Sequence, residues 1–167
     1  MVRFQSKMIW TTFLIASAGL LLALASILPA YAAPLTPISG NFVFTVTGVT
    51  SDTNSSGNNI VKFTFSETLT GNIAGTRTGT GTQITYPDGS FNVRNCGTFV
   101  GTVLEIPGTA HDCATAQGAG NSFNGQFATT KGTGELAGSH VWASFVGGGT
   151  GPTTTAGTYS GEFVFGA

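Results

Sequence analysis

The segment Tyr159-Ser160-Gly161-Glu162-Phe163 is the clearest indication of the fold, because it places a glycine between two bulky residues at alternate positions. In an extended strand these three positions share one face. A glycine there leaves space that an aromatic ring of a neighbouring strand fills, and it lets the sheet bend sharply. The same spacing recurs at Leu69-Gly71-Ile73, Phe99-Gly101-Val103 and Phe123-Gly125-Phe127. Apart from Gly71, which fits a turn, these glycines favour an all-β fold, a closed antiparallel β-barrel of about eight strands, with a β-sandwich as the alternative.

Period-two alternation of apolar and polar residues predicts strands elsewhere in the chain. Phe42, Phe44 and Val46, for example, share one face of an extended segment. Pro87-Asp88-Gly89 predicts a turn, because proline presets φ and glycine accepts a positive φ. This turn joins a strand ending at residue 86 to one starting at residue 91. Further strands are expected at residues 42–47, 60–69, 97–106, 121–129, 136–146 and 157–165, with a polar loop over residues 51–59.

The N-terminal residues follow the order of a secretory signal peptide. Basic residues precede an apolar run over residues 8–28, and a small-residue cleavage site follows Pro29. We predict cleavage after Ala32, with Ala33 as the alternative. An uncleaved anchor is the competing interpretation, because the run approaches the roughly 20 residues that span a bilayer; this segment is the only expected membrane contact. Residues 1–32 are thus assigned to the signal peptide, 33–39 to an N-terminal lead and 40–167 to the barrel domain.

The composition is that of a weakly charged exported domain. Charged residues make up 8% of the chain, against roughly 25% in ordinary globular proteins. Cleavage after residue 32 leaves four basic and seven acidic residues, a net charge of −3. Such a balance does not recruit a polyanion, so we expect no nucleic-acid partner. The expected location is extracellular or at the cell surface.

Cys96 and Cys113 are the only cysteines, and an even count in an exported chain predicts a disulfide between them. His111 is expected in a loop beside this bond. His111, Asp112 and Cys113 do not form a nucleophile with its base, because consecutive residues of an extended chain point to alternate sides. Zinc needs three or four ligands, and the other histidine, His140, belongs to another segment. We therefore expect no catalytic residue, no metal and no cofactor.

Glu67 is the acidic residue with a candidate inward position, because it shares strand parity with Phe63 and Phe65. An unpaired carboxylate in the interior is costly, and burial raises its pKa. Arg77 or Arg94 is the expected partner. The alternative is that Glu67 lies at a strand end in solvent.

Residues 132–138 (GTGELAG) and 157–165 (GTYSGEFVF) resemble the uncharacterised bacterial domain-of-unknown-function family 3224. The likeness extends weakly from Gly40 to Phe165 and is specific only in the C-terminal third. It implies a barrel similar to that of allene oxide cyclase and the dirigent proteins. The family has no established activity, so the resemblance implies a fold and not a function.

Three functions from different classes suit such a barrel. An interior lined by Phe, Val and Ile suits a small apolar ligand. The alternatives are a structural or surface-associated domain with a filled core, and a cyclase or dirigent-type enzyme. Trp142, Phe145 and Tyr159 are expected in the core, with a ligand-stacking surface as the other interpretation. The sequence favours a protein that is not an enzyme. The presence of a cavity separates a ligand-binding or enzymatic barrel from a structural domain with a filled core.

Overall fold

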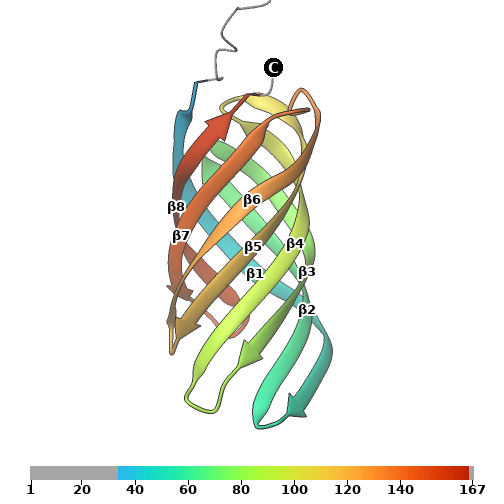
Figure 1. Ribbon diagram of the computed structural model, residues 1–167, viewed down its shortest axis with the longest axis vertical. Coiled ribbons are helices and arrows are strands. Elements are labelled where there is room, and N and C mark those ends of the chain that lie inside the picture. The colour runs from blue at the N-terminus through green and yellow to red at the C-terminus, as the bar shows by residue number, and fades with distance from the viewer. Residues whose placement is uncertain (1–33, 166–167) are drawn as a thin grey trace, which may run out of the picture. The chain divides into compact units, whose positions relative to one another are not determined.

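The computed structural model describes residues 34–165, which form eight antiparallel strands. Each strand pairs with the next one along the chain, and β1 pairs with β8, so the ring is closed (Figure 1). The predicted barrel of about eight strands is therefore confirmed, and the sandwich alternative is wrong. The strands are β1 (Thr36–Ser55), β2 (Asn58–Gly71), β3 (Ile73–Thr85), β4 (Ser90–Val103), β5 (Ile106–Ala119), β6 (Ser122–Gly134), β7 (His140–Gly149) and β8 (Thr154–Val164).

The strand predicted over residues 97–106 is strand β4 only as far as Val103, and its last residues span the turn between β4 and β5. Leu104 and Glu105 form this turn with φ values of 50° and 68°. Neither is a usual residue for a positive φ, so no turn signal marks the position. Strand β5 went unpredicted because its interior positions carry small residues such as Ala110 and Ala114, which give a weak alternation.

Other predicted boundaries also differ from the structure. The loop expected over residues 51–59 is mostly strand, since β1 and β2 remain paired until Ser55 and Asn58. The strand expected from residue 136 begins only at His140. Leu136 instead lies in the β6–β7 turn, where it is 1% exposed. By contrast, the turn at Pro87-Asp88-Gly89 is present between β3 and β4, and Gly89 has a φ of 82°.

Gly101, Gly125 and Gly161 occupy crowded positions on the inner wall, but only Gly125 leaves space for an aromatic ring of an adjacent strand, as predicted. A side chain at Gly125 would overlap the Phe145 ring from β7, the adjacent strand. At Gly101 the nearby ring is that of Phe99 from the same strand, 2.8 Å from the site of a Cβ atom. At Gly161 the close neighbour is the β7 backbone at residues 142–143 and not an aromatic ring. All three positions leave no room for a larger residue.

The two ends of the barrel differ in packing. The closed end carries the turns at residues 72, 104–105 and 135–139, and Ile38, Leu136 and Phe163 there are at most 3% exposed. The open end carries the turns at residues 56–57, 86–89, 120–121 and 150–153. Inward residues near that end, such as Phe91 and Val93, are only half-buried. Strand β1 starts and β8 finishes at the closed end (Figure 1).

No helix long and apolar enough to cross a membrane occurs within residues 34–165. The predicted signal peptide and its cleavage site at Ala32 or Ala33 lie outside the described residues. Strand β1 begins at Thr36, within the stretch assigned to the N-terminal lead.

Candidate functional site

A cavity of about 260 Å³ occupies the barrel interior. Its wall is mainly apolar and rich in phenylalanine, and it includes the Phe42, Phe44 and Val46 face predicted from alternation. The cavity reaches the exposed β7–β8 loop at residues 151–153, so it extends to the open end of the barrel. The interior is therefore not packed solid along its whole length.

Polar side chains from four consecutive strands meet in this interior. Glu67 comes from β2, Arg77 from β3, Asn95 from β4 and Asp112 from β5, and all four line the cavity. We call these four residues the polar cluster. Each occupies an inward position of its strand because side chains alternate between the two faces. Glu67 and Arg77 are also direct register partners, which places them side by side.

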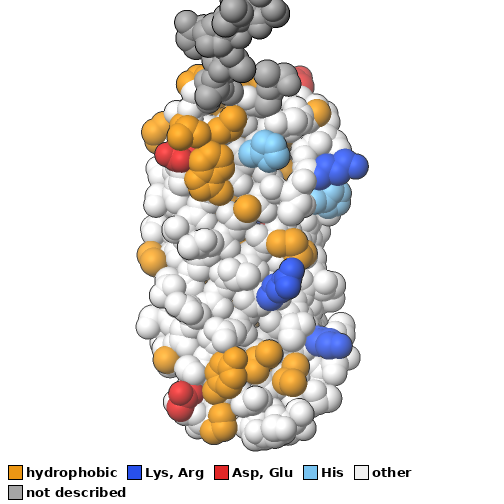
Figure 2. Space-filling view, in the orientation of Figure 1, with side chains coloured by type: hydrophobic (Ala, Val, Ile, Leu, Met, Phe, Trp, Pro, Cys, Tyr) orange, Lys and Arg blue, Asp and Glu red, His pale blue; other side chains and the backbone are white. Residues whose placement is uncertain are grey.

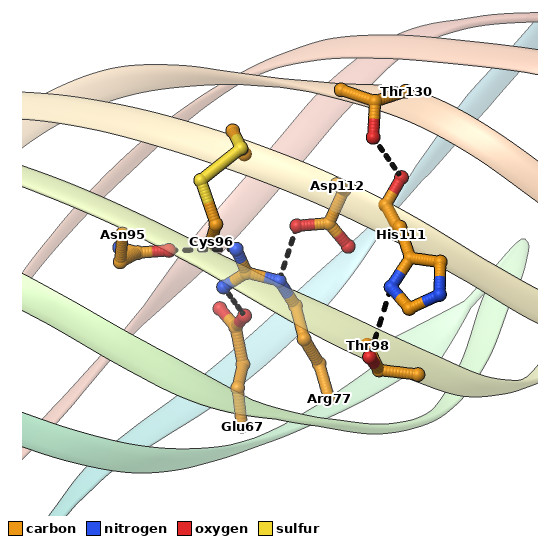
Figure 3. Close-up of polar contacts among 9 residues, drawn as sticks. Glu67, Arg77, Asn95, Cys96, Thr98, His111, Asp112 and Thr130 are labelled. Atoms are coloured by element: carbon orange, nitrogen blue, oxygen red, sulfur yellow. Dashed lines mark hydrogen bonds and ion pairs between the residues drawn. A yellow bond between two sulfur atoms is a disulfide. The ribbon is translucent and has the colours of Figure 1, made fainter.

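The Arg77 guanidinium lies at the centre of the polar cluster (Figure 3). Its Nε donates to Asp112 Oδ1 at 2.5 Å, one Nη donates to Glu67 Oε2 at 3.0 Å, and the other donates to Asn95 Oδ1 at 2.6 Å. Three strands are thereby tied to one cation. Such charge-assisted hydrogen bonds are stronger than neutral ones, and they hold the guanidinium in a fixed orientation.

Phe65 supports the guanidinium from one side. The central carbon of the Arg77 guanidinium lies 4.8 Å from the centroid of the Phe65 ring, within the range of a cation–π contact. Gly97 on β4 makes this arrangement possible, because a Cβ atom there would lie 3.1 Å from the Phe65 ring and 3.2 Å from Arg77 Cγ. The absence of a side chain at Gly97 thus leaves room for both residues.

A β-bulge lies beside Asp112. The register between β5 and β6 shifts between His111 and Asp112, which leaves Thr130 without an opposite residue. Thr130 Oγ1 donates to the carbonyl oxygen of His111 at 3.1 Å (Figure 3). Bulges redirect neighbouring side chains, and this one adjoins the carboxylate that contacts Arg77.

Burial raises the pKa of both carboxyl groups in the polar cluster. Desolvation is the largest influence on Glu67 and on Asp112, and the nearby Arg77 charge lowers each pKa by less than burial raises it. The exposed fractions of the two side chains are 14% and 6%. With both carboxyl groups ionised, two negative charges face one positive charge. The polar cluster therefore favours the uptake of a positive charge or a proton.

Each carboxylate in the polar cluster retains one oxygen with no hydrogen bond to the described part of the chain. These atoms are Glu67 Oε1 and Asp112 Oδ2, since Arg77 contacts the other oxygen of each group. Within residues 34–165, no fully buried side-chain oxygen or nitrogen lacks a partner. Both free oxygens must therefore have accessible surface, and because both residues line the cavity, they face it.

Tyr159 lines the cavity but its hydroxyl is already engaged. The hydroxyl oxygen accepts a hydrogen bond from the Ile73 backbone N–H at 2.8 Å, and it lies 3.2 Å from the carbonyl oxygens of Thr70 and Ile73. Burial raises its pKa. Gly40 on β1 lies directly beneath this hydroxyl, so Tyr159 reaches across β1 to the β2–β3 turn. The Tyr159 hydroxyl therefore forms its hydrogen bonds with the barrel backbone and not with a group in the cavity.

The outer face holds several residues that the sequence singled out. The predicted disulfide between Cys96 and Cys113 is present and joins register partners on β4 and β5. His111 lies on strand β5 and not in a loop; it is exposed, with Nδ1 3.0 Å from Thr98 Oγ1. Trp142, expected in the core, is 41% exposed, whereas Phe145 and Tyr159 face inward.

The remaining charged candidates lie apart from the cavity. Arg94, the second partner considered for Glu67, is exposed on β4. Glu105, Glu135 and His140 are also exposed. On the face drawn in Figure 2, the few charged side chains are scattered among uncharged ones. Across residues 34–165, no group of three or more His, Cys, Asp or Glu side chains is arranged to hold a metal ion.

The sequence indicated Glu67 and a partner arginine but missed the rest of the polar cluster. Asp112 was considered only together with His111 and Cys113, whose side chains point to the other face of β5. The alternation of Ala110, Asp112 and Ala114, all buried, is the signal that marks an inward carboxylate. Asn95 carries no comparable signal, because its inward position follows from the register of β4.

The fold is similar to that of solved structures. One is a protein of unknown function from the DUF3224 family of Shewanella oneidensis MR-1, with a TM-score of 0.63 and 17% sequence identity, over 80% of this chain and 99% of that one. Another is the pterocarpan synthase dirigent protein GePTS1, with a TM-score of 0.47 and 12% identity, over 84% and 94% of the two chains. No protein-family model and no curated protein match the sequence. The chain thus has a barrel fold similar to that of a DUF3224 protein, the family that its segments at residues 132–138 and 157–165 resemble.

Proposed function

We propose that this protein binds a small, mainly apolar molecule inside its barrel. The observation that carries the proposal is the interior cavity of about 260 Å³ between aromatic walls. An apolar protein cavity of roughly 150 Å³ binds benzene, so this interior has room for a molecule larger than one aromatic ring. Binding sites of this kind combine apolar walls with a few polar groups that fix the orientation of the ligand, and the polar cluster supplies such groups.

A structural role with a filled core receives less support. Protein interiors normally pack without voids of this size, because each void forfeits dispersion contacts. The closed end shows that this chain can pack tightly, since Leu136 there is 1% exposed. The retained space farther along the barrel therefore favours a ligand over a purely structural domain.

A cyclase or dirigent-type enzyme is the second candidate. Glu67 and Asp112 face the cavity with raised pKa values, and perturbed carboxyl groups in a cavity are candidate acids or bases. The discriminating measurement is the connectivity and stereochemistry of the molecule, determined by NMR before and after incubation with the protein, because a cyclisation rearranges bonds without changing the mass. Unchanged connectivity and unchanged stereochemistry favour binding alone.

Export is the second part of the proposal. It rests on the signal-peptide order of residues 3–32 and on the disulfide, because disulfides persist in oxidising compartments. We expect secreted material to begin at Ala33. N-terminal sequencing of protein from the culture medium tests this, and retention of Met1 would contradict it.

The binding proposal is tested by native mass spectrometry of protein purified from its host, comparing the parent with Ala116→Phe. Ala116 lines the cavity, so a phenylalanine there fills part of the space. Thr115→Phe is the matched control, because Thr115 is exposed on the outer face of the same strand. We expect a bound small molecule on the parent and on the control, and none on Ala116→Phe. Equal occupancy of all three proteins, or an empty parent in host extract, would contradict the proposal.

A further inference from the structure

The charge inside the barrel narrows the class of ligand. Among the cavity-lining residues in the described part of the chain, the charged side chains are Glu67, Arg77 and Asp112. The one other titratable residue on this wall, Tyr159, has its hydroxyl bonded to backbone. With both carboxylates ionised, the wall of the cavity carries a net charge of −1 from these side chains. An anionic ligand would add to this unfavourable buried charge, whereas a cation would neutralise it.

The hydrogen-bonding capacity of the polar cluster points in the same direction. Arg77 uses three of its five N–H donors on Glu67, Asn95 and Asp112, which fixes its guanidinium in place. The two carboxylate oxygens left over, Glu67 Oε1 and Asp112 Oδ2, face the cavity and can only accept hydrogen bonds when ionised. A protonated amine brings three donors and a positive charge, so it matches these acceptors in both respects.

The aromatic wall fits the same ligand. Phe44 and Phe63 line the cavity from β1 and β2, and their ring centroids are 6.1 Å apart in an edge-to-face arrangement. Faces of such rings attract cations and also bury apolar groups. Arg77 already makes one contact of this kind with Phe65, so the interior accommodates a cation beside phenylalanine.

We propose that the molecule bound in the cavity is a small amine with an apolar body, whose ammonium group donates hydrogen bonds to the free oxygens of Glu67 and Asp112. This inference rests on the proposed binding function and names the class of its ligand. The apolar body lies against the phenylalanine wall toward the open end. Burial raises the pKa of each carboxyl group, so the empty barrel disfavours the second negative charge, which a bound cation would neutralise.

The test compares three probes that share one ring and differ in charge: 2-phenylethylamine, 2-phenylethanol and phenylacetate. Their affinities for the disulfide-bonded barrel are measured by isothermal titration calorimetry at neutral pH, where the amine is protonated and phenylacetate is ionised. We expect the amine to bind about tenfold more tightly than the alcohol, because a charge-assisted hydrogen bond is about twice as strong as a neutral one. Phenylacetate should bind most weakly.

Two isosteric variants locate the effect. Glu67→Gln and Asp112→Asn each remove one negative charge, and each should lower the affinity for the amine about tenfold while changing that for the alcohol about twofold or less. Glu105→Gln is the control, because Glu105 is exposed in the β4–β5 turn and lies apart from the cavity. It should change neither affinity. The probe series on the unmodified barrel decides the question even where a variant does not fold.

The outcomes separate this inference from the proposed function. Tighter binding of the amine, lost in both variants, supports it. Binding of the alcohol or of phenylacetate as tight as that of the amine overturns the inference and leaves the apolar binding site standing. If no probe binds and the parent protein is also empty in host extract, the inference and the proposed function fail together.

Discussion

The closed and open ends of the barrel are built from the same eight strands, yet they differ in what fills them. At the closed end, Ile38, Leu136 and Phe163 are almost fully buried. From the polar cluster toward the open end, inward residues such as Phe91 and Val93 are half-buried and face a cavity. One end therefore supplies stability through close packing, whereas the rest of the interior keeps space and charge that stability alone does not require.

Removal of Arg77 should have the largest effect on this arrangement. Arg77→Met leaves Glu67 and Asp112 buried without their shared partner, and loss of one member of a buried ion pair costs about 3–5 kcal/mol. Arg94→Met is the control, because Arg94 is exposed and exposed substitutions stay within about 0.5 kcal/mol. The free energy of unfolding, measured with urea, distinguishes them. Equal values for the two variants would mean that the polar cluster is solvated.

Truncating one side chain at each end of the barrel tests the difference in packing. Leu136→Ala at the closed end should lower the free energy of unfolding by about 2–5 kcal/mol, because it leaves a void in a packed region. Val93→Ala removes a half-buried side chain beside an existing cavity and should cost about 1 kcal/mol. Urea unfolding of both variants tests the difference. A larger loss for Val93→Ala would show that the open end is the better packed of the two.

The strand glycines test whether the wall itself is tightly packed around the cavity. Gly125→Val should destabilise by about 1–3 kcal/mol, because the new side chain overlaps the Phe145 ring, although strand propensity favours valine. Gly151→Ala is the control in the β7–β8 loop, where a Cβ atom would meet only Thr154 at 3.9 Å. It should leave stability unchanged or slightly higher. Thermal melts that place Gly125→Val at or above the parent would contradict an inward Gly125.

How much of the fold could be predicted from the sequence depends on the size of the inward side chains in each strand. Phenylalanine and glycine alternate in β6, and this spacing was enough to predict a barrel. In β5 the inward residues are small, so the strand and its Asp112 gave no comparable pattern. The turn at Leu104 and Glu105 lacks glycine, which hid the boundary between β4 and β5.

The polar cluster could be predicted only in part, for a different reason. Strand parity indicates an inward Glu67, and the need for a compensating charge leaves Arg77 and Arg94 as its candidate partners. Asn95 and Asp112 join the polar cluster only once the register of β3, β4 and β5 is known. The register of two paired strands depends on where the turn between them lies. Because the turn at residues 104–105 was not predicted, the register of β4 with β5 could not be predicted from turn positions. The predicted disulfide contains this information, because Cys96 and Cys113 are register partners and their bond fixes the pairing of β4 with β5.

The pH dependence of stability gives the smallest expected effect. Folding raises the pKa of Glu67 and Asp112 above their unfolded values, so the folded barrel binds more protons than the unfolded chain over that interval. The contribution of these groups is therefore most favourable below their unfolded pKa, near pH 4, and declines as pH rises through the folded pKa. Glu67→Gln should flatten this decline. Urea unfolding from pH 4 to pH 8 measures it, and a steeper decline in the variant would reverse the assignment.

The free energy of unfolding of Ala116→Phe shows whether the barrel encloses unfilled space. Ala116 lines the cavity, and a phenylalanine there enters empty volume if the cavity is real. We expect a free energy of unfolding within about 1 kcal/mol of the parent or above it, since burial of apolar area offsets the entropy of ordering the ring. A loss of about 1–3 kcal/mol, the usual cost of overpacking, would show that the interior is already full and would remove the ligand with it.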